Sequence, residues 1–462
     1  MNFFYKYTLK YKVLLNKYIM ENETVKTEKW YQSITVKMIL LAGMGLMLLI
    51  PLFLIQNVIR EREGYANDAR AEIGRLWASS QTITGPVLNV PGMKVINDKG
   101  EYETTTMHIM PENLKVNGNV KPEVRYRGIY ESVVYDSDIE LTGSFNTTGF
   151  ENLNDYTYDW SKAYITLGVS DNKGLRGDVR LVMGNRTTEA EPGAVQHDVF
   201  EKGITFLQPV LSSNPADFKG NFSIKLGLKG SETLSFSPVG KTTEVNLSSP
   251  WSSPSFQGTF LPTSRDVSAN GFKATWLVTH LNRNFPQAWT GASYHPENDS
   301  FGVNLMLQVD HYTKTERSAK YGILFILFTF FVLLIVELRS SERIHLFYYL
   351  LVAFALILFF SLLSALSEHV GFNAAYLISS VAIIGLLSAF FRSLTKKWWV
   401  VLLISGLLST LYLFIFVLLA LKDYAYLGGN IGLFIILAVL MMVSSKFRLF
   451  SDKKDKDGFL SI

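Results

Sequence analysis

The side chains in this sequence best suited to chemistry stand together at the end of one long apolar run. Ile344–Leu366 contains no Asp, Glu, Lys or Arg, and polar residues close it. The candidate functional patch is Ser361, Ser364, Ser367, Glu368 and His369. At ~100° per residue on a helix, its serines and Glu368 fall within about 120° of one another. Serine, histidine and a carboxylate are the components of a nucleophilic triad, which is defined by geometry and roles.

The spacing within this patch argues against a triad. Glu368 and His369 are adjacent, so on a helix their side chains point ~100° apart and Glu368 is poorly placed to orient His369. A second interpretation is a helix end at the level of the lipid headgroups, with Gly371 allowing the chain to turn. A third is a docking point for the β domain or for the stalk helix, modulated by protonation of His369 near a pKa of ~6.5. We therefore predict no catalytic residue.

Other chemistries lack their usual residues. The chain has no cysteine, which excludes disulfides, thiolate nucleophiles and cysteine metal ligands. Its histidines are scattered, without an i, i+4 pair or a His-Glu-x-x-His motif, so no metal ion or other cofactor is predicted. A Gly-x-Ser-x-Gly nucleophile motif is also absent. The net charge of +4 is small and dispersed, which argues against nucleic acid as a partner.

Hydrophobicity divides the chain into two kinds of segment. Six apolar runs are long enough to cross a hydrocarbon core of ~30 Å as helices. They are Met38–Ile59, Tyr321–Val336, Ile344–Leu366, Asn373–Phe391, Trp398–Leu421 and Tyr426–Ser445. The first is followed by Arg60-Glu61-Arg62-Glu63 rather than a small-residue cleavage site, so it is predicted to be an uncleaved anchor. The lipid bilayer is thus the first predicted partner.

Basic residues next to these runs predict their orientation, because cytoplasmic loops are enriched in Lys and Arg. With the amino terminus inside, the basic residues of the cytoplasmic loops are Arg339, Arg343, Arg392, Lys396 and Lys397. The short outer loops hold only Lys422 as a basic residue besides His369. Both termini are therefore predicted to be cytoplasmic, with the polar middle of the chain outside the cytoplasm.

No charged residue lies in the middle of a predicted span, which argues against an ion-coupled transporter. Small residues within the last three spans are instead expected to mark close helix approach. These are Gly385, Ser388, Gly406, Ser409, Gly428, Gly429 and Gly432. Residues 1–37 are rich in lysine, with an apolar face between Phe3 and Tyr18. They are compatible with a helix in the membrane interface, with a disordered tail, or with a translation start at Met20 or later.

From about Gln81 the hydrophobic period changes from 3.6 to 2. The apolar residues Phe301, Val303, Leu305, Leu307 and Val309 stand two positions apart, as in half-buried antiparallel strands. Turn signals such as Asn270-Gly271 separate such segments. We predict a short stalk helix followed by a large antiparallel β domain resembling a sandwich.

Several stretches of the sequence resemble the CreD family of bacterial inner-membrane proteins. They include Gly85-Pro86-Val87-Leu88-Asn89-Val90-Pro91, Pro254-Ser255-Phe256-Gln257-Gly258-Thr259-Phe260-Leu261-Pro262, Arg317-Ser318-Ala319-Lys320-Tyr321 and Leu366-Ser367-Glu368-His369. The resemblance implies an inner-membrane protein linked to cell-envelope integrity, whose expression belongs to a two-component regulatory system. It implies no defined biochemical activity. The physical interpretation of the β-region stretches is strand starts, bends and core aromatics, with a ligand groove at Trp251, Phe256 and Trp276 as the alternative.

These observations predict a multi-pass α + β membrane protein of the bacterial inner membrane. The expected parts are a basic cytoplasmic tail (1–37), an anchor (38–59), a periplasmic domain (60–317), a five-helix unit (318–445) and a charged cytoplasmic tail (446–462). The predicted function is a non-enzymatic scaffold for envelope integrity or envelope stress, which contacts envelope proteins or cell-wall components. The alternative is a transporter or enzyme for an envelope lipid or cell-wall precursor, acting through the patch at Ser361–His369.

Overall fold

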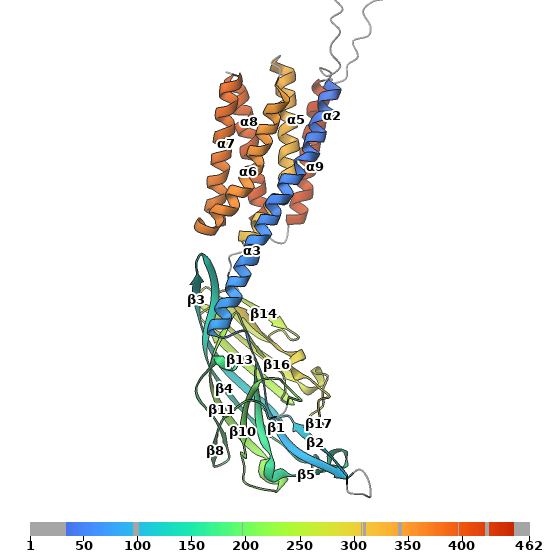
Figure 1. The fold of residues 1–462 in the computed structure, drawn as a ribbon, viewed down its shortest axis with the longest axis vertical. Helices are drawn as coiled ribbons and strands as arrows, with labels where there is room; N and C mark the ends of the chain where they lie inside the picture. Colours follow the sequence, from blue (N-terminus) through green and yellow to red (C-terminus); the bar gives the residue numbers. More distant parts are fainter. Residues whose placement is uncertain are drawn as a thin grey trace, which may run out of the picture. The chain divides into compact units, whose positions relative to one another are not determined.

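The computed structural model describes residues 34–95, 101–195, 197–305, 307, 311–340, 344–395, 397–420 and 425–447. Two compact units make up the chain, Met1–Arg62 with His311–Ile462 and Glu63–Asp310. The first is helical and the second is built of β-strands (Figure 1). Most of the predicted basic and charged tails lies outside the described residues.

The helical unit contains the membrane-type helices expected from the apolar runs. Its helices are α2 (Ile34–Met47), α3 (Leu49–Trp77), α4 (His311–Lys320), α5 (Gly322–Ser340), α6 (Leu346–Val370), α7 (Phe372–Thr395), α8 (Trp398–Ala420) and α9 (Ala425–Phe447). The part of α3 from Glu63 onward belongs to the second unit. Among the described residues, five segments are long and apolar enough to span a membrane. They are Val36–Trp77, His311–Leu338, Leu346–Val370, Phe372–Thr395 and Trp398–Ala420. The helix α9 overlaps the sixth predicted span, so six crossings stay a prediction.

The helix of the first predicted span has a short irregularity next to Pro51. A single residue, Leu48, separates α2 from α3, three positions before Pro51. Proline has no N–H to bond the carbonyl four residues back, which is here Met47. The neighbouring bonds persist, since Leu48 N donates to Met44 O at 2.9 Å and Leu52 N donates to Leu48 O at 3.3 Å. The helical path therefore continues past the proline with one bond missing.

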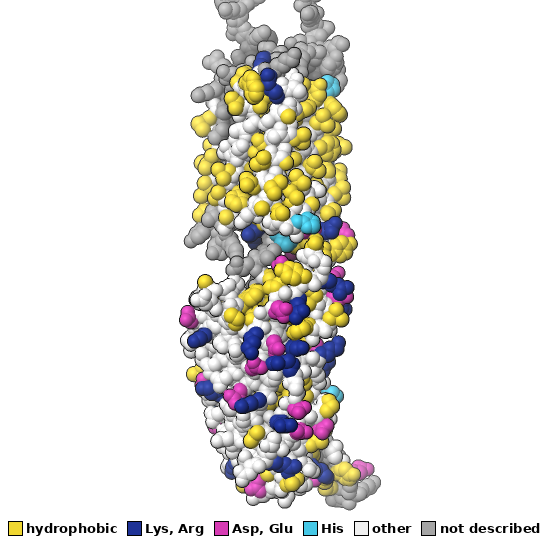
Figure 2. All heavy atoms as spheres, turned by 90° about the vertical axis from the view of Figure 1, so that its left-hand side faces the viewer, with side chains coloured by type: hydrophobic (Ala, Val, Ile, Leu, Met, Phe, Trp, Pro, Cys, Tyr) yellow, Lys and Arg dark blue, Asp and Glu magenta, His cyan; other side chains and the backbone are white. Residues whose placement is uncertain are grey.

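The helices share a buried apolar cluster, while other large apolar side chains face outward. Tyr349, Phe359 and Leu363 of α6 are buried, whereas Phe354 and Leu358 are about half exposed. Apolar side chains cover the face of the helical unit seen in Figure 2. An apolar outer surface of this kind is stable in lipid rather than in water.

The β unit consists of two sheets. The ten-stranded sheet has the order β14 (Pro254–Gly258), β18 (Phe301–Leu305), β12 (Thr233–Phe236), β1 (Gln81–Val95), β6 (Tyr164–Val169), β10 (Gly203–Leu207) and β9 (Glu191–Pro192), with β2 (Tyr102–Ile109), β5 (Thr157–Tyr158) and β17 (Ala288–Thr290) off this path. The eight-stranded sheet has the order β15 (Ser264–Ser268), β16 (Gly271–Thr279), β13 (Thr242–Ser249), β3 (Asn113–Arg127), β4 (Tyr130–Phe145), β11 (Gly220–Ser231), β7 (Leu175–Met183) and β8 (Arg186–Glu189).

In the strands, residues that alternate between apolar and polar in the sequence also alternate between buried and less buried, as the period of 2 predicts. In β13, buried Val245 and Leu247 alternate with less buried Glu244 and Asn246. Inward residues of both sheets belong to one hydrophobic cluster. Within it Trp276 is fully buried and packs edge-on against Phe256, with ring centroids 5.7 Å apart. Trp276 is thus part of the core and Phe256 packs against it, as the physical interpretation of this stretch expects.

The purely antiparallel arrangement predicted for the β region is wrong at two places. β1 pairs in parallel with β12, and β3 pairs in parallel with β13. The remaining ladders of the two sheets that the structure describes are antiparallel. Alternation specifies which face of a strand is buried, but it carries no information on the direction of the neighbouring strand.

Candidate functional site

The predicted patch on α6 is divided between two faces of the helix. Ser364 and Ser367 are buried, whereas Ser361 and His369 are exposed and Glu368 is intermediate. Ser367 Oγ donates to the Ser364 carbonyl at 2.9 Å, so its hydroxyl is used within the helix. Ser361 instead lines an outward-facing apolar hollow with Pro51 and Leu358. The five residues therefore do not converge on one point.

Glu368 is held by a residue that the sequence analysis did not single out. The Tyr312 hydroxyl of α4 donates to Glu368 Oε1 at 3.1 Å, and Tyr312 is itself buried. Further along α4, Arg60 Nε of α3 lies 3.1 Å from Glu316 Oε1, and Gln56 Nε2 donates to the Ala319 carbonyl at 3.3 Å. The short helix α4 thus joins α3 to α6 within the helical unit.

The sequence does contain a signal for α4. Tyr312, Thr315, Ser318 and Ala319 recur at helical spacing and are the buried positions of an otherwise polar segment. That segment lies directly before a long apolar run. The sequence analysis therefore treated it as the loop leading to the span and predicted no separate helix there. Its contact with Glu368 gives the carboxylate a structural role at a helix junction.

A second polar cluster joins α2, α5 and α6. Lys37 Nζ forms an ion pair with the Glu337 carboxylate and donates to the Ile344 carbonyl at 2.8 Å. The Tyr349 hydroxyl donates to Glu337 Oε2 at 3.1 Å, and Lys37 lies 5.2 Å from the Tyr349 ring centroid. The sequence analysis placed Lys37 in the basic tail. The structure instead makes it a largely buried contact of the first helix.

The β unit contains a buried polar row that crosses three adjacent strands. His108 of β2, Asn89 of β1 and Thr166 of β6 are all nearly inaccessible. Asn89 Nδ2 donates to the Val87 carbonyl at 3.0 Å and to Thr166 Oγ1 at 2.8 Å. Its Oδ1 is therefore the atom that accepts from His108 Nδ1, at 2.7 Å. This network determines which ring nitrogen of His108 carries the proton in the neutral form.

The other ring nitrogen of His108 faces a carboxylate. Nε2 lies 3.4 Å from Asp198 Oδ2, and Asp198 is about 30% exposed. Burial lowers the pKa of His108 to about 4, although the charge and hydrogen bonding of Asp198 act in the opposite direction. The Trp289 ring packs against the imidazole, with centroids 5.7 Å apart. His108 is thus a neutral core histidine that faces one acidic neighbour.

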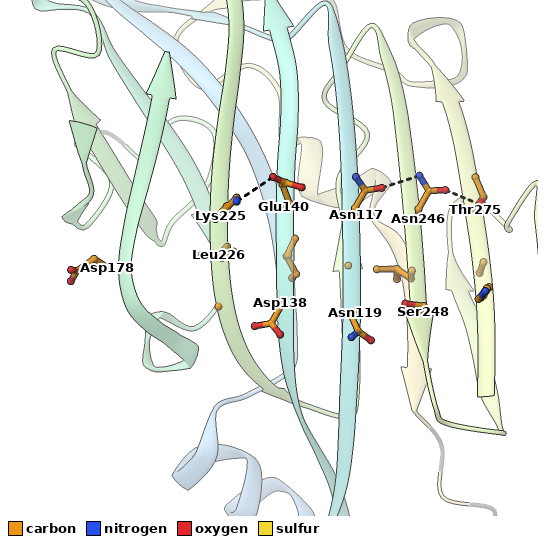
Figure 3. A pocket seen from close by; sticks show the side chains of 16 residues that line it. Asn117, Asn119, Asp138, Glu140, Asp178, Lys225, Leu226, Asn246, Ser248 and Thr275 are labelled. Atoms are coloured by element: carbon orange, nitrogen blue, oxygen red, sulfur yellow. Dashed lines mark hydrogen bonds and ion pairs between the residues drawn. The ribbon is translucent and has the colours of Figure 1, made fainter. Parts of the chain in front are cut away.

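The outer face of the eight-stranded sheet carries a polar groove of about 770 Å³ (Figure 3). Amides and hydroxyls line its middle, where Asn246 Nδ2 donates to Asn117 Oδ1 at 3.3 Å and Thr275 Oγ1 donates to Asn246 Oδ1 at 2.8 Å. Charged side chains lie along the same face, among them Lys225 and Glu140 at 3.9 Å. The groove offers many donors and acceptors on a rigid sheet.

Charges on this face are largely paired. The pKa of Asp138 is lowered mainly by a hydrogen bond from Lys121, and Arg176 adds to the effect. The pKa of Glu244 is lowered mainly by a hydrogen bond from Asn246 and further by Lys115. Exposed pairs of this kind contribute little to stability. They leave the groove chemically polar and close to neutral, which suits recognition by hydrogen bonding rather than by net charge.

Within the described ranges, no group of three or more His, Cys, Asp or Glu residues is placed to hold a metal ion.

Comparison with known proteins identifies the family of the chain. The family model described as inner membrane protein CreD matches residues 33–449. The inner membrane protein CreD of Escherichia coli (strain K12) is 33% identical over 420 residues, covering 88% of this chain and 92% of that protein. The chain belongs to the CreD family.

Membership of the CreD family agrees with an inner-membrane protein that has several apolar helices and a β domain. The CreD-like stretch Gly85–Pro91 lies in β1, at the centre of the ten-stranded sheet, and Pro254–Gly258 forms β14 at its edge. The CreD-like stretch around Glu368 is the end of α6 that contacts α4. These stretches therefore occupy strands and a helix junction.

Likeness to solved structures adds nothing to the family assignment. Two structures of a mutant M1 zinc metallopeptidase from Deinococcus radiodurans, one bound to a Tyr-Ser-Ala substrate, are 12% identical and have a TM-score of 0.18. The alignment spans 42% of this chain and 42% of the metallopeptidase. So low a score carries no argument about fold or activity.

Proposed function

We propose that this CreD-family protein is a non-enzymatic scaffold of the inner membrane that contributes to cell-envelope integrity. Its β domain, a sandwich in the periplasm, binds an envelope protein or a cell-wall component. The observation that carries the proposal is the polar groove on the eight-stranded sheet, lined by Asn117, Asn246 and Thr275. Hydrogen-bonding groups on a rigid sheet can recognise a polar polymer or a protein strand without a catalytic group.

The architecture supports this role because apolar helices flank the β unit at both ends. Glu63 follows the anchor, and Asp310 precedes α4 and α5. Two covalent attachments keep a binding domain near the bilayer and limit its range. We also propose the arrangement with six spans, both termini in the cytoplasm and domain limits at 60–317 and 318–445. The distribution of Lys and Arg supports this orientation.

The test compares the groove with the α6 patch in cells that lack the native protein. Asn119→Arg with Ser248→Arg places bulk and charge in the groove at side chains that line it. We expect this variant to lose at least half of the envelope phenotype, measured as resistance to detergent, while its membrane level is unchanged. Glu368→Gln with His369→Gln should retain most of the phenotype if the protein inserts normally.

The opposite pattern would contradict the scaffold. If the α6 variant inserts normally but loses function, while the groove variant keeps it, the patch performs the essential step. A photocrosslinking residue at Asn119 provides a second measurement. It should capture an envelope component that the same probe at exposed Leu281 does not capture.

The alternative function is the handling of an envelope lipid, and one observation favours it. An apolar cavity of about 510 Å³ lies between α5, α8 and α9, lined by Phe328, Gly406, Thr410, Phe414 and Ile435 among others. Its lining matches an acyl chain better than a polar precursor. A Gly406→Leu variant that fills the cavity should leave a scaffold's envelope phenotype intact. Loss of that phenotype with normal insertion would favour lipid handling.

A further inference from the structure

One hairpin of the eight-stranded sheet extends beyond its neighbours. β3 and β4 pair from Asn113 opposite Ser144 as far as Arg127 opposite Tyr130. The ladder between β13 and β3 ends at Asn119, and the ladder between β11 and β4 ends at Val134. Beyond these points the two strands bond only to each other among the described strands. A two-stranded ribbon is marginally stable in water unless another element packs against it.

The tip of this ribbon presents large apolar surface. Tyr126 is 67% exposed and Ile129 is 42% exposed, on either side of Gly128. Gly128 has a φ of 61°, and a Cβ added to it would meet no atom within 4 Å. The turn therefore faces open space where a side chain at Gly128 would be. Tyrosine beside an aliphatic residue is the combination found where a protein meets lipid headgroups.

Contacts with α3 show which way the ribbon points. Trp77 Nε1 donates to the Tyr135 carbonyl at 3.4 Å, and Arg70 Nε donates to the Glu131 carbonyl at 3.1 Å. From Tyr135 to Glu131 the strand advances by roughly 13 Å, while the helix runs back from Trp77 to Arg70 by roughly 10 Å. The ribbon thus lies along α3 and points toward Glu63, the first residue of the β unit.

Chain continuity brings that end of the β unit close to the bilayer. Glu63 is four residues beyond Ile59, the last residue of the first apolar run, and both lie within α3, where four residues advance by roughly 6 Å. Glu131 lies beside Arg70, and the tip continues past it by roughly 7 Å, most of the way to the level of Glu63. The headgroup layer extends roughly 5–8 Å beyond the hydrocarbon core. The tip is therefore within reach of the headgroups.

We propose that the tip of the β3–β4 hairpin, Tyr126–Tyr130, inserts into the headgroup layer of the membrane that holds the protein's own anchor. This contact is a third attachment of the β domain, and it is independent of any ligand in the polar groove. It covers the apolar tip, which stays exposed although the ribbon packs along α3.

The arginines near the tip are already engaged within the protein. Arg127 Nη2 lies 2.6 Å from Glu72 Oε1 of α3, and Arg125 Nη2 donates to Glu123 Oε2 at 2.9 Å. The Arg125 guanidinium also lies 5.0 Å from the Trp77 ring centroid. Because these charges are paired, insertion depends on Tyr126 and Ile129 rather than on anionic lipid.

The absence of cysteine from the sequence makes a direct depth measurement simple. Full-length Ile129→Cys, labelled with an environment-sensitive fluorophore, is reconstituted into vesicles of phosphatidylethanolamine and phosphatidylglycerol. We expect blue-shifted emission and at least threefold stronger quenching by a headgroup-region lipid quencher than for the control. The control is Leu281→Cys, at a residue that is 84% exposed.

Leu281 is a suitable control because it belongs to the far end of the same sheet. It follows Thr279, which pairs with Thr242, and Thr242 pairs with Asn113 at the start of β3. Fourteen residues of β3 separate Asn113 from Arg127, or roughly 45 Å. Emission and quenching equal at the two probes would overturn the proposal.

A second arm tests the role assigned to the apolar side chains. In vesicles of phosphatidylcholine alone, the Ile129→Cys probe should keep its blue shift and its quenching. If both are lost, headgroup charge drives the contact and the proposed apolar insertion is wrong. Adding Tyr126→Asp to the labelled protein should reduce the quenching by half or more, and an unchanged signal would also contradict the proposal.

Discussion

At the scale of single residues, the role of a polar side chain in this protein depends on the residues that surround it. In the sequence Glu368 was a candidate member of a reactive patch, yet its carboxylate accepts a hydrogen bond from buried Tyr312 at a helix junction. His108 drew no attention as one of several scattered histidines, yet it is the centre of a buried polar row. Lys37 likewise became part of an ion pair with Glu337. Each role depends on a partner that is distant in sequence.

His108 makes the β domain sensitive to acid. Its pKa is lowered from 6.5 to about 4 in the folded protein, mainly by burial. The folded state therefore favours neutral histidine, and this contribution to stability is complete above pH 6.5 and decreases as the pH falls toward 4. We expect the thermal midpoint of the purified protein to decrease over that interval, and the decrease to be clearly smaller in His108→Gln.

The slope against pH is the informative quantity, because His108→Gln also changes packing at every pH. His280→Gln is the matched control, since His280 is exposed on the same domain. It should retain the wild-type slope. A variant at His108 whose midpoint follows the wild type in parallel from pH 6.5 to 4 would show that another group is responsible.

At the scale of helices, small residues do not all have the same meaning. The sequence analysis expected close helix approach at every one of them. A Cβ on Gly432 of α9 would overlap the Phe414 ring of α8, so close approach is confirmed there. It is wrong for Gly385 and Gly406, where an added Cβ would meet no atom within 4 Å. It is also confirmed at Ser388, whose hydroxyl bonds that of Ser405 across α7 and α8 at 2.6 Å.

This difference predicts opposite results for two identical substitutions. Gly432→Ala should destabilise the contact between α8 and α9 by about 1–3 kcal/mol, because the methyl group overlaps Phe414. Gly406→Ala should be neutral or stabilising by up to about 1 kcal/mol, because alanine favours helix and its methyl group has room. Thermal unfolding in one detergent measures both. Equal losses of stability would mean that the Phe414 contact is not what requires glycine.

In the sheets, burial could be predicted more reliably than pairing. Val245 and Leu247 of β13 are buried as their alternation indicates. The parallel neighbour of β13 is β3, which lies more than a hundred residues earlier in the chain. The spacing of apolar residues within β13 does not indicate which strand pairs with it, because pairing depends on contacts between strands that are distant in sequence.

At the scale of the whole molecule, the proposed orientation predicts which positions face out of the cytoplasm. Single cysteines in this cysteine-free chain provide the probe. Asn221→Cys in the β domain should react with a membrane-impermeant maleimide in intact spheroplasts. Ser393→Cys, beside Arg392 at the end of α7, should react only after permeabilisation. Both residues are exposed, so lack of labelling reflects the membrane rather than burial.

A reversed pattern would invalidate the orientation and with it the periplasmic β domain. Labelling of both cysteines in intact spheroplasts would instead indicate leaky cells. A cytoplasmic enzyme released during preparation serves as the control for leakage. The family assignment to inner membrane protein CreD would stand in either case, because it depends on sequence similarity.

Sequence alone determined the apolar helices, the β domain between them and the kinship with CreD. Hydrophobic length and period are local properties, set by whether lipid, water or a core surrounds each residue. Only the tertiary structure decided that Glu368 meets Tyr312, that His108 faces Asp198 and that the tip at Ile129 extends beyond its neighbours. Such contacts join segments far apart in the chain, and their energies arise only once folding has brought those segments together.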